Sequence, residues 1–87
     1  MGPCASGMDK TIHGKDQRIL CGLLRQFRES AGLRQVDVAA RLAEPQSFVS
    51  KYESGERRLD LIELREVCRA IEVELIVLVE RFQNELP

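Results

Sequence analysis

The sequence predicts an all-α domain of five helices. Apolar residues recur at intervals of three and four through most of the chain after residue 15, which is the period of amphipathic helices. Signals that begin or end helices separate these periodic stretches. No stretch alternates between apolar and polar residues for long enough to indicate a strand. With 87 residues, the chain has room for one small core and little room for a deep catalytic cleft.

The N-terminal residues 1–15 are predicted to form a flexible arm, and residues 16–87 the helical domain. The arm contains three of the six glycines and one proline, without an apolar period. Met8 is an alternative native start, in which case the residues before it are a cloning remnant. The sequence leaves both interpretations open.

The first periodic stretch predicts a helix that begins at Asp16 and ends before Gly32. Asp16 is the expected N-cap, and Gly32 the expected C-terminal stop, with Leu33 folding back against the helix. The expected inner face consists of Ile19, Leu20, Leu23, Leu24, Phe27 and Ala31.

Two short helices are predicted next, over residues 35–42 and from Pro45 to about Glu53. Proline is tolerated at the first helical position, so Pro45 fits the start of a helix. Ala39 is small enough to let the two helices cross closely. The residues expected to lock the pair into the core are Val38, Leu42, Val49 and Tyr52. Two short helices joined by a tight turn have the outline of a helix-turn-helix.

The last part of the chain predicts a fourth helix and a fifth apolar stretch over residues 75–86. Asp60 and Glu63 form a carboxylate version of the capping box at the start of the fourth helix. Its expected inner face consists of Leu61, Leu64, Val67, Cys68 and Ile71. The same three- and four-residue steps continue to Phe82, so one unbroken helix over residues 61–86 is an alternative.

The composition excludes several classes of protein. Three scattered cysteines without a CxxC pair do not form a disulfide framework, and they suit a reducing cytoplasm. A single histidine, His13, argues against a zinc site, and no cofactor is expected. The apolar run over residues 75–79 is far shorter than the roughly 20 residues of a membrane helix. No nucleophile is paired with a base, so the chain is not predicted to be an enzyme.

The net charge of −1 argues against nucleic-acid binding when the chain is taken as a whole. The charges are unevenly distributed, however. Residues 18–58 hold eight basic against five acidic residues, a surplus of +3, whereas residues 59–87 hold three against seven, a deficit of −4. The basic part includes the two short helices, and the acidic part lies in the helices that follow them.

The outer face of the second short helix carries Gln46, Ser47, Ser50 and Lys51, none of which has an evident role in a core. Glutamine and lysine are suited to base edges in the major groove, where adenine offers a donor and an acceptor and guanine offers two acceptors. The alternative interpretation is an ordinary solvated helix face.

The segments AGLRQVDVAARL and QSFVSKYESGERRLD together resemble the phage-repressor-like helix-turn-helix family (Cro-type, xenobiotic-response-element), over about residues 20–80. The resemblance implies a five-helix, lambda-repressor-like domain. It implies that Gln46, Ser47, Ser50 and Lys51 meet bases and adjacent phosphates. It also implies a structural ion pair between Arg28 and Glu53. The residues that it implies as DNA-backbone contacts are Gln35, Ser54, Arg57 and Arg58.

Three positions depart from the family pattern. Ala43 stands in place of the usual turn glycine, Leu59 in place of a common proline, and Glu72 in place of the glycine after the fourth helix. A left-handed conformation at Ala43 would cost about 1 kcal/mol relative to glycine. The last two departures put the end of the fourth helix in question. Because the family has a break there, a break near residues 72–74 is the preferred interpretation.

The run over residues 75–79 covers the whole circumference of a helix, so both of its sides require burial. One side can pack within the chain, and the other is predicted to form a homodimer interface; the interface residues are Leu75, Ile76, Val79 and Phe82. A partly exposed apolar end is the alternative.

These expectations describe a sequence-specific DNA-binding regulator, a repressor that binds an inverted-repeat operator as a homodimer, with no small-molecule ligand and no membrane partner. The alternative is a protein-interaction module of the same fold, of antitoxin or anti-repressor type, which acts through its apolar C-terminal helix.

Overall fold

The computed structural model of the chain describes residues 14–85. These residues form five helices and no strand, which confirms the all-α prediction. The helices are α2 (Lys15–Ser30), α3 (Gln35–Leu42), α4 (Gln46–Ser54), α5 (Leu61–Ala70) and α6 (Leu75–Glu85). The predicted arm lies outside the described residues, except for its last two positions.

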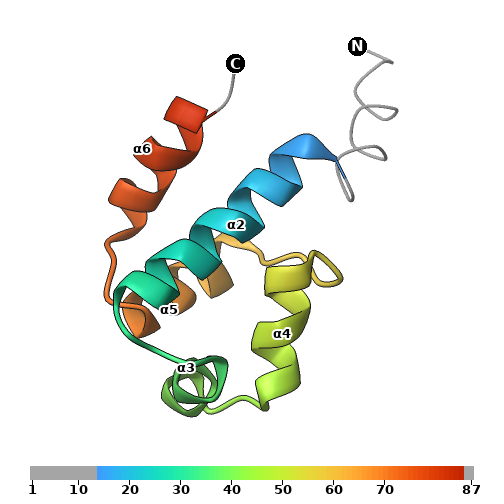
Figure 1. Ribbon diagram of the computed structural model, residues 1–87, viewed down its shortest axis with the longest axis vertical. Coiled ribbons are helices and arrows are strands. Elements are labelled where there is room, and N and C mark those ends of the chain that lie inside the picture. Colours follow the sequence, from blue (N-terminus) through green and yellow to red (C-terminus); the bar gives the residue numbers. More distant parts are fainter. Residues whose placement is uncertain (1–13, 86–87) are drawn as a thin grey trace.

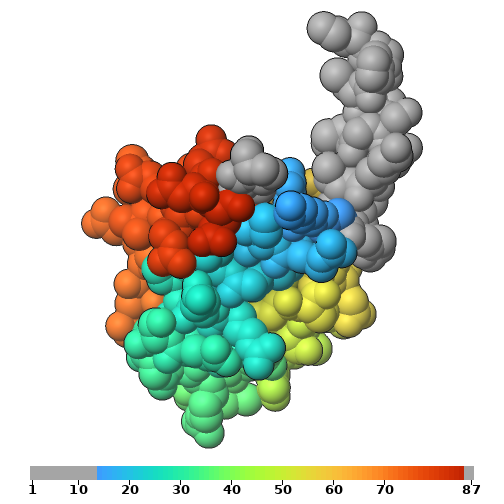
Figure 2. All heavy atoms as spheres, turned by 45° about the horizontal axis from the view of Figure 1, so that its top comes forward, coloured from blue at the N-terminus to red at the C-terminus, as the bar shows by residue number. Residues whose placement is uncertain are grey.

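Helices α2 and α5 form a common support for the other three helices (Figure 1). The short helices α3 and α4 pack closely against each other at one end of the molecule, and α6 lies at the other end. Helix α2 contacts both α4 and α6, while α5 contacts both α3 and α6. In the space-filling view of Figure 2, α6 lies against α2, away from α3 and α4. The fold therefore holds the helix-turn-helix on one side of a common support and α6 on the other.

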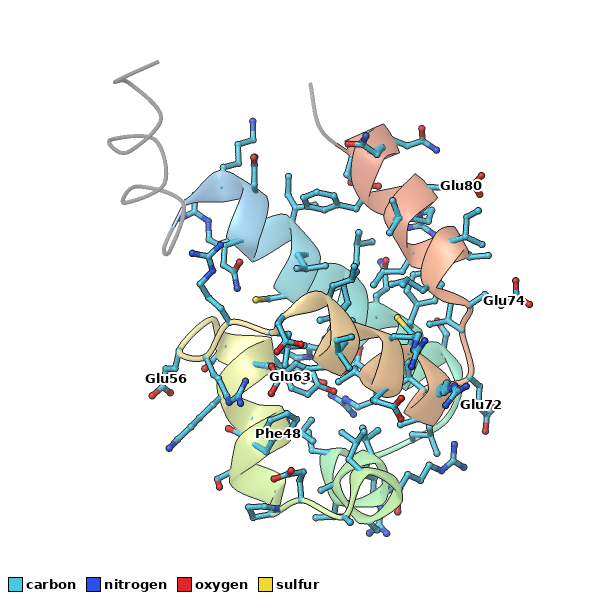
Figure 3. All side chains as sticks on the ribbon, turned by 180° about the vertical axis from the view of Figure 1, so that it is seen from behind. Phe48, Glu56, Glu63, Glu72, Glu74 and Glu80 are labelled. Carbon is cyan, nitrogen blue, oxygen red and sulfur yellow. The ribbon has the colours of Figure 1, made fainter. Side chains whose placement is uncertain are left out.

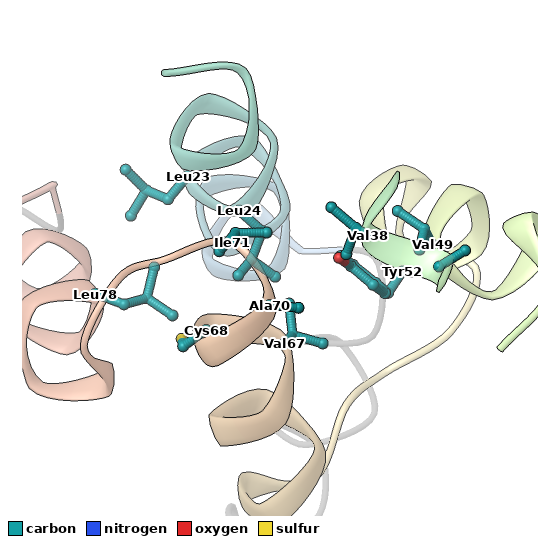
Figure 4. Packing of buried hydrophobic residues seen from close by; sticks show 11 residues of the cluster. Leu23, Leu24, Val38, Val49, Tyr52, Val67, Cys68, Ala70, Ile71 and Leu78 are labelled. Carbon is teal, nitrogen blue, oxygen red and sulfur yellow. The ribbon is translucent and has the colours of Figure 1, made fainter. Parts of the chain in front are cut away.

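The core runs between the helix-turn-helix and α6 (Figure 4). Tyr52, Val38 and Val49 gather on the side of α3 and α4, and Leu78 reaches the same core from α6. All four side chains are 1% exposed or less. Expected inward residues that are buried or packed against this core include Leu23, Leu24, Ala39, Leu42, Val67, Cys68 and Ile71.

The start of α2 differs from the prediction, whereas its end agrees with it. Asp16 is not the N-cap, because α2 begins at Lys15 with Gly14 as its N-cap. Asp16 lies in the first turn, where its charge complements the helix dipole. At the other end, Gly32 is left-handed, with φ +74°, and the Leu33 amide donates to the Arg28 carbonyl at 3.1 Å. This is the predicted glycine stop.

Two turns place a residue other than glycine in the left-handed region. Ala43, in the turn between α3 and α4, has φ 56°, and Glu72, in the turn between α5 and α6, has φ 65°. The second turn decides between the two interpretations of the C-terminal segment, because α5 ends at Ala70 and α6 begins at Leu75. The preferred break is confirmed, and the continuous helix over residues 61–86 is wrong.

The starts of α4 and α5 refine the predicted boundaries. Pro45 is the N-cap of α4 rather than its first helical residue, because its ψ of 157° is extended. Asp60 caps α5 as predicted: its carboxylate accepts from the Glu63 amide at 2.7 Å, and the Glu63 carboxylate accepts from the Asp60 amide at 3.1 Å. Leu61 was expected to point inward, but it is 67% exposed. Leu61 lies on the apolar stripe of α5 as the periodicity indicated, but no other described element covers it. None of the helices within residues 14–85 combines the length and apolar character needed to cross a membrane.

Candidate nucleic-acid interface

Helix α4 separates its polar and apolar residues onto opposite faces. Gln46, Ser47, Ser50 and Lys51 are all exposed. Val49 and Tyr52 point into the core and are 0% and 1% exposed. The Tyr52 hydroxyl is buried without a hydrogen-bond partner among the described residues, and burial raises the pKa of this phenol. The four residues predicted to read bases therefore share one accessible surface on a helix whose back is fixed in the core.

A buried ion pair holds the C-terminal half of α4 against α2. The Arg28 Nε donates to Glu53 Oε2 at 2.7 Å, and Nη2 donates to Oε1 at 3.2 Å. These side chains are 9% and 4% exposed. The hydrogen bond to Glu53 raises the pKa of Arg28, so the guanidinium stays charged at any pH at which the protein folds. A third bond, from Nη1 to the Leu33 carbonyl at 2.8 Å, connects the same arginine to the turn between α2 and α3.

This ion pair extends to the exposed face of α4 through two glutamines. The Gln35 Nε2 donates to Glu53 Oε1 at 3.0 Å, and the Gln46 Nε2 donates to Gln35 Oε1 at 3.3 Å. Gln35 lies at the first position of α3 and Gln46 at the first position of α4. The predicted phosphate-binding residue thus lies between the buried ion pair and a predicted base-reading residue, and it orients the Gln46 amide group.

The segment after α4 is fixed by contacts with α5. Arg57 forms a bidentate ion pair with Glu63, at 2.8 and 3.1 Å, and its guanidinium lies 4.7 Å from the centre of the Phe48 ring. Figure 3 shows Phe48 and Glu63 on this side of α4 and α5. The hydrogen bonds from Arg57 hold the pKa of Glu63 below its usual range. The family resemblance implied a phosphate contact for Arg57, and the ion pair of Arg57 with Glu63 was not predicted.

The other backbone-contact residues are more accessible. The Ser54 hydroxyl donates to the Lys51 carbonyl at 3.1 Å and lies 3.3 Å from Glu56 Oε2. The side chains of Lys51 and Arg58 are exposed and form no ion pair with any described residue. Most other arginines of residues 18–58 are paired with carboxylates, namely Arg25, Arg28, Arg34, Arg41 and Arg57. Lys51 and Arg58 are therefore the cations beside α4 that are available to a phosphate without loss of an ion pair.

The start of α3 contains a contact that was not predicted from the sequence. The Arg34 guanidinium pairs with Asp37 at 3.0 Å, and the Asp37 carboxylate also accepts from the Arg34 amide at 2.8 Å. These bonds lower the pKa of Asp37 to about 2. The three-residue spacing of an arginine and an aspartate at a helix start could have indicated this contact.

The residues predicted to form a dimer interface fall on two sides of α6. Leu75 and Phe82 pack against the core of their own chain, whereas Ile76 and Val79 are 64% and 42% exposed. Val77, which was not among the predicted residues, is 39% exposed. Glu74, directly before α6, and Glu80, within it, point away from the body of the molecule (Figure 3). The outer side of α6 is therefore an apolar strip flanked by acidic residues.

The described residues contain no cluster of three histidine, cysteine, aspartate or glutamate side chains that could hold a metal ion. Cys21 and Cys68 are buried free thiols, and burial raises the pKa of both, that of Cys68 to about 11. A groove of about 440 Å³ between α3, α4 and α5 is lined by both charged and apolar side chains, including Phe48 and Ile62. The outer face of α4 is therefore the candidate site, because its exposed polar side chains lie on a helix that is fixed in the core.

Comparisons with known proteins agree with this geometry. A family model described as helix-turn-helix matches residues 24–78. A solved structure of an XRE-family like protein from Pseudomonas syringae pv. tomato str. DC3000 is 44% identical, with a TM-score of 0.81, over 92% of this chain and 98% of that one. No curated protein sequence is significantly similar.

More distant structural neighbours share the fold. The wild-type restriction-modification controller protein C.Esp1396I is 20% identical, with a TM-score of 0.77, over 84% of this chain and 96% of that one. The same controller protein has been solved as a tetramer in complex with its natural 35 base-pair operator, with the same identity and TM-score.

Proposed function

Because the chain belongs to the XRE-type helix-turn-helix family, we propose that it is a transcriptional regulator that binds specific DNA sequences. We propose further that it binds an inverted repeat as a homodimer and represses transcription by occupying this operator. The observation that carries the proposal is the outer face of α4, where exposed polar side chains are attached through Gln35 to a buried ion pair.

The mechanism follows from the position of α4 in the major groove. Gln46 can donate to N7 and accept from N6 of adenine. Lys51 can donate to the two acceptors of guanine. The bond between Gln46 and Gln35 restricts the rotation of the Gln46 amide before DNA arrives, so less conformational entropy is lost on binding.

Backbone contacts are expected from the amide groups at the start of α3 and from Lys51 and Arg58. The first amides of a helix have no intrahelical partner and favour a phosphate. With most other arginines of this part of the chain already paired, few phosphates are neutralised. We therefore expect modest non-specific affinity with a shallow salt dependence.

The dimer is proposed to form through the exposed apolar strip of α6. A second copy would cover Ile76, Val77 and Val79, which the chain itself leaves exposed. In such a dimer, two copies of α4 would enter successive major grooves roughly 34 Å apart, which requires an inverted repeat. The tetrameric assembly of C.Esp1396I on its operator supports a multimeric regulator, since that protein shares the fold.

Selection of bound sequences from a random DNA pool tests the proposal directly. We expect a motif with two inverted half-sites. Replacement of Gln46 or Lys51 with alanine should preserve the fold and reduce discrimination at one position of each half-site by about 1–3 kcal/mol. If no motif is enriched, or if both variants select the unchanged motif with unchanged affinity, the proposed reading face is wrong.

The alanine variants of the adjacent residues Arg57 and Arg58 can be compared to test the backbone contacts. Arg58→Ala should weaken binding to all sequences alike and reduce the salt slope by about one unit, with unchanged thermal stability. Arg57→Ala should mainly lower thermal stability, because it removes the bidentate contact with Glu63. The reverse pattern would assign the phosphate contact to Arg57 instead.

A second candidate function uses the same apolar strip. The chain would then be a protein-interaction module of antitoxin or anti-repressor type, with α6 bound to a different protein. The exposure of Ile76 and Val79 favours an interaction of some kind. Light scattering at micromolar concentration distinguishes the candidates: a stable dimer supports the regulator, and a monomer that selects no DNA motif supports the interaction module.

A further inference from the structure

Arg41 connects the last turn of α3 to the turn between α5 and α6. Its Nη1 donates to the Ala70 carbonyl at 2.7 Å and to Glu72 Oε2 at 2.9 Å. Ala70 is the last residue of α5, whose carbonyl has no partner within the helix. Glu72 is the left-handed residue that redirects the chain toward α6. One guanidinium group thus holds both the end of α5 and the turn that leads into α6.

The contact of Arg41 links the α3–α4 unit to the turn that leads into α6. The unit formed by α3 and α4 is supported by α2 and α5, and α6 packs on the same two helices. On the α2 side, the buried pair of Arg28 and Glu53 fixes α4. On the α5 side, Arg41 reaches from α3 to the residues that lead into α6. The side chains of Arg41 and Glu72 are 42% and 57% exposed, so we expect this ion pair to contribute little to the free energy of unfolding.

We infer that Arg41 is a positioning residue that fixes the orientation of α4 relative to α6, and thereby the half-site spacing that the dimer accepts. The inference rests on the proposed function, since it requires α6 at the dimer axis and α4 in the major groove. The sequence did not indicate a functional role for Arg41 or Glu72, and neither residue lies on the outer face of α4.

Half-site spacing is a sensitive measure of this orientation. One additional base pair moves a half-site by about 3.4 Å and rotates it by about 34° around the DNA axis. A dimer with rigidly placed reading helices cannot follow both changes without strain. Loss of the contact at Arg41 should let the α3–α4 unit shift relative to α6, so that other spacings become acceptable.

The experiment measures affinity for a series of operators with the selected half-sites at the optimal spacing and at spacings longer or shorter by one and two base pairs. The wild-type protein is expected to lose about tenfold or more in affinity for each single-pair change. Arg41→Ala should reduce this penalty to about threefold or less, with affinity at the optimal spacing lowered by a smaller factor.

Three further variants separate positioning from a general loss of charge or stability. Arg69→Ala is the matched control, because Arg69 is an exposed arginine in the last turn of α5 whose one ion pair with a described residue is with Glu66 of its own helix. It should keep the wild-type spacing profile. Glu72→Asn keeps a residue that tolerates the left-handed conformation and removes the carboxylate, so it should flatten the profile partly. Arg41→Lys should give a profile between those of wild type and Arg41→Ala.

The outcomes distinguish the inference from the proposed function. If wild type depends on spacing and Arg41→Ala has the same profile, the role of Arg41 is wrong while the dimeric regulator stands. If Arg69→Ala flattens the profile as much as Arg41→Ala, the effect arises from charge and the inference is again wrong. If wild type itself shows no dependence on spacing, both the proposed dimer and the inference fail.

Discussion

The α3–α4 unit and helix α6 both pack on α2 and α5, but different kinds of contact hold them there. The α3–α4 unit is held by directional polar contacts in addition to its apolar residues, chiefly the pair of Arg28 and Glu53 and the bonds of Gln35. Helix α6 is held mainly by apolar side chains, such as Leu78 and Phe82. Their outer faces differ correspondingly, because α4 exposes polar residues and α6 exposes Ile76 and Val79.

This difference separates two tasks. Hydrogen bonds and ion pairs fix orientation, which a helix needs if its side chains are to meet base edges at defined positions. Apolar burial is not directional, and an exposed apolar strip gains free energy from any complementary surface. A rigid polar face is thus suited to sequence recognition, and the strip on α6 is suited to association with a second copy.

The largest expected effect comes from breaking the polar attachment of α4. Arg28→Ala leaves the carboxylate of Glu53 buried and deprives it of its charged partner, so we expect a loss of about 3–5 kcal/mol in the free energy of unfolding. Urea denaturation measures this loss. The control is Arg25→Ala, which removes an exposed pair with Glu29 and should cost less than about 0.5 kcal/mol. Equal losses in the two variants would show that the buried pair does not anchor α4.

The next effect compares the two sides of α6. Leu78 is fully buried, so Leu78→Ala should lower the free energy of unfolding by about 2–5 kcal/mol through the cavity that it leaves. Ile76 is 64% exposed, and Ile76→Ala should change the stability of the monomer by less than about 0.5 kcal/mol. It should instead weaken dimerisation in sedimentation equilibrium. A dimer unaffected by Ile76→Ala would place the interface elsewhere.

The sequence predicted the helices well because their signals are local. Periodicity gave the number of helices, and the capping pair of Asp60 and Glu63 placed the start of α5. One error was local, because Gly14 and not Asp16 is the N-cap of α2. Another depends on distant elements. Leu61 lies on the apolar stripe of α5, yet whether a neighbour covers it depends on the packing of the other helices. Local pattern fixes the direction of a side chain but does not determine what lies opposite it.

The positions of the site residues could be predicted from the sequence, but most of the hydrogen bonds between them could not. The sequence placed Gln46 and Lys51 on an accessible face, because helical spacing determines which residues lie beside one another. It did not reveal that Gln35 joins Gln46 to Glu53, since this contact spans two helices and a turn. The ion pair of Arg57 with Glu63 could not be predicted for a different reason. A surface arginine can reach several acceptors, and the path of the loop determines which of them it binds.

A smaller effect compares the turns that precede α4 and α6. Ala43 and Glu72 both adopt the left-handed conformation that favours glycine. Ala43→Gly should raise the free energy of unfolding by about 0.5–1 kcal/mol, because relief of strain exceeds the entropy that glycine adds to the unfolded chain. Glu72→Gly relieves the same strain but loses the contact with Arg41, so its gain should be smaller. Thermal unfolding of both variants measures the difference, and a larger gain for Glu72→Gly would show that the Arg41 contact is not stabilising.

The smallest effect concerns the exposed polar contact at the start of α3, and it depends on pH. Hydrogen bonds from Arg34 lower the pKa of Asp37 to about 2, below the value of about 3.9 of an unfolded chain. A group whose pKa is lower in the folded state stabilises the protein above its unfolded pKa, and this contribution is lost as the pH falls toward 2. Wild type should therefore melt at a higher temperature than Asp37→Asn at pH 7, and the gap should narrow between pH 4 and pH 2 (about the two pKa values).

Arg34→Ala is the partner variant for this measurement, since it removes the donor and keeps the carboxylate. Its Asp37 should titrate closer to the unfolded value, which NMR observation of the carboxyl carbon reports directly. The screening of exposed charges means that the gap in melting temperature should also shrink at high salt, unlike the effect of Arg28→Ala at its buried pair. A gap that persists unchanged down to pH 2, or an Asp37 that titrates near 3.9 in wild type (about the unfolded value), would show that the polar contacts of the α3–α4 unit do not extend to its surface.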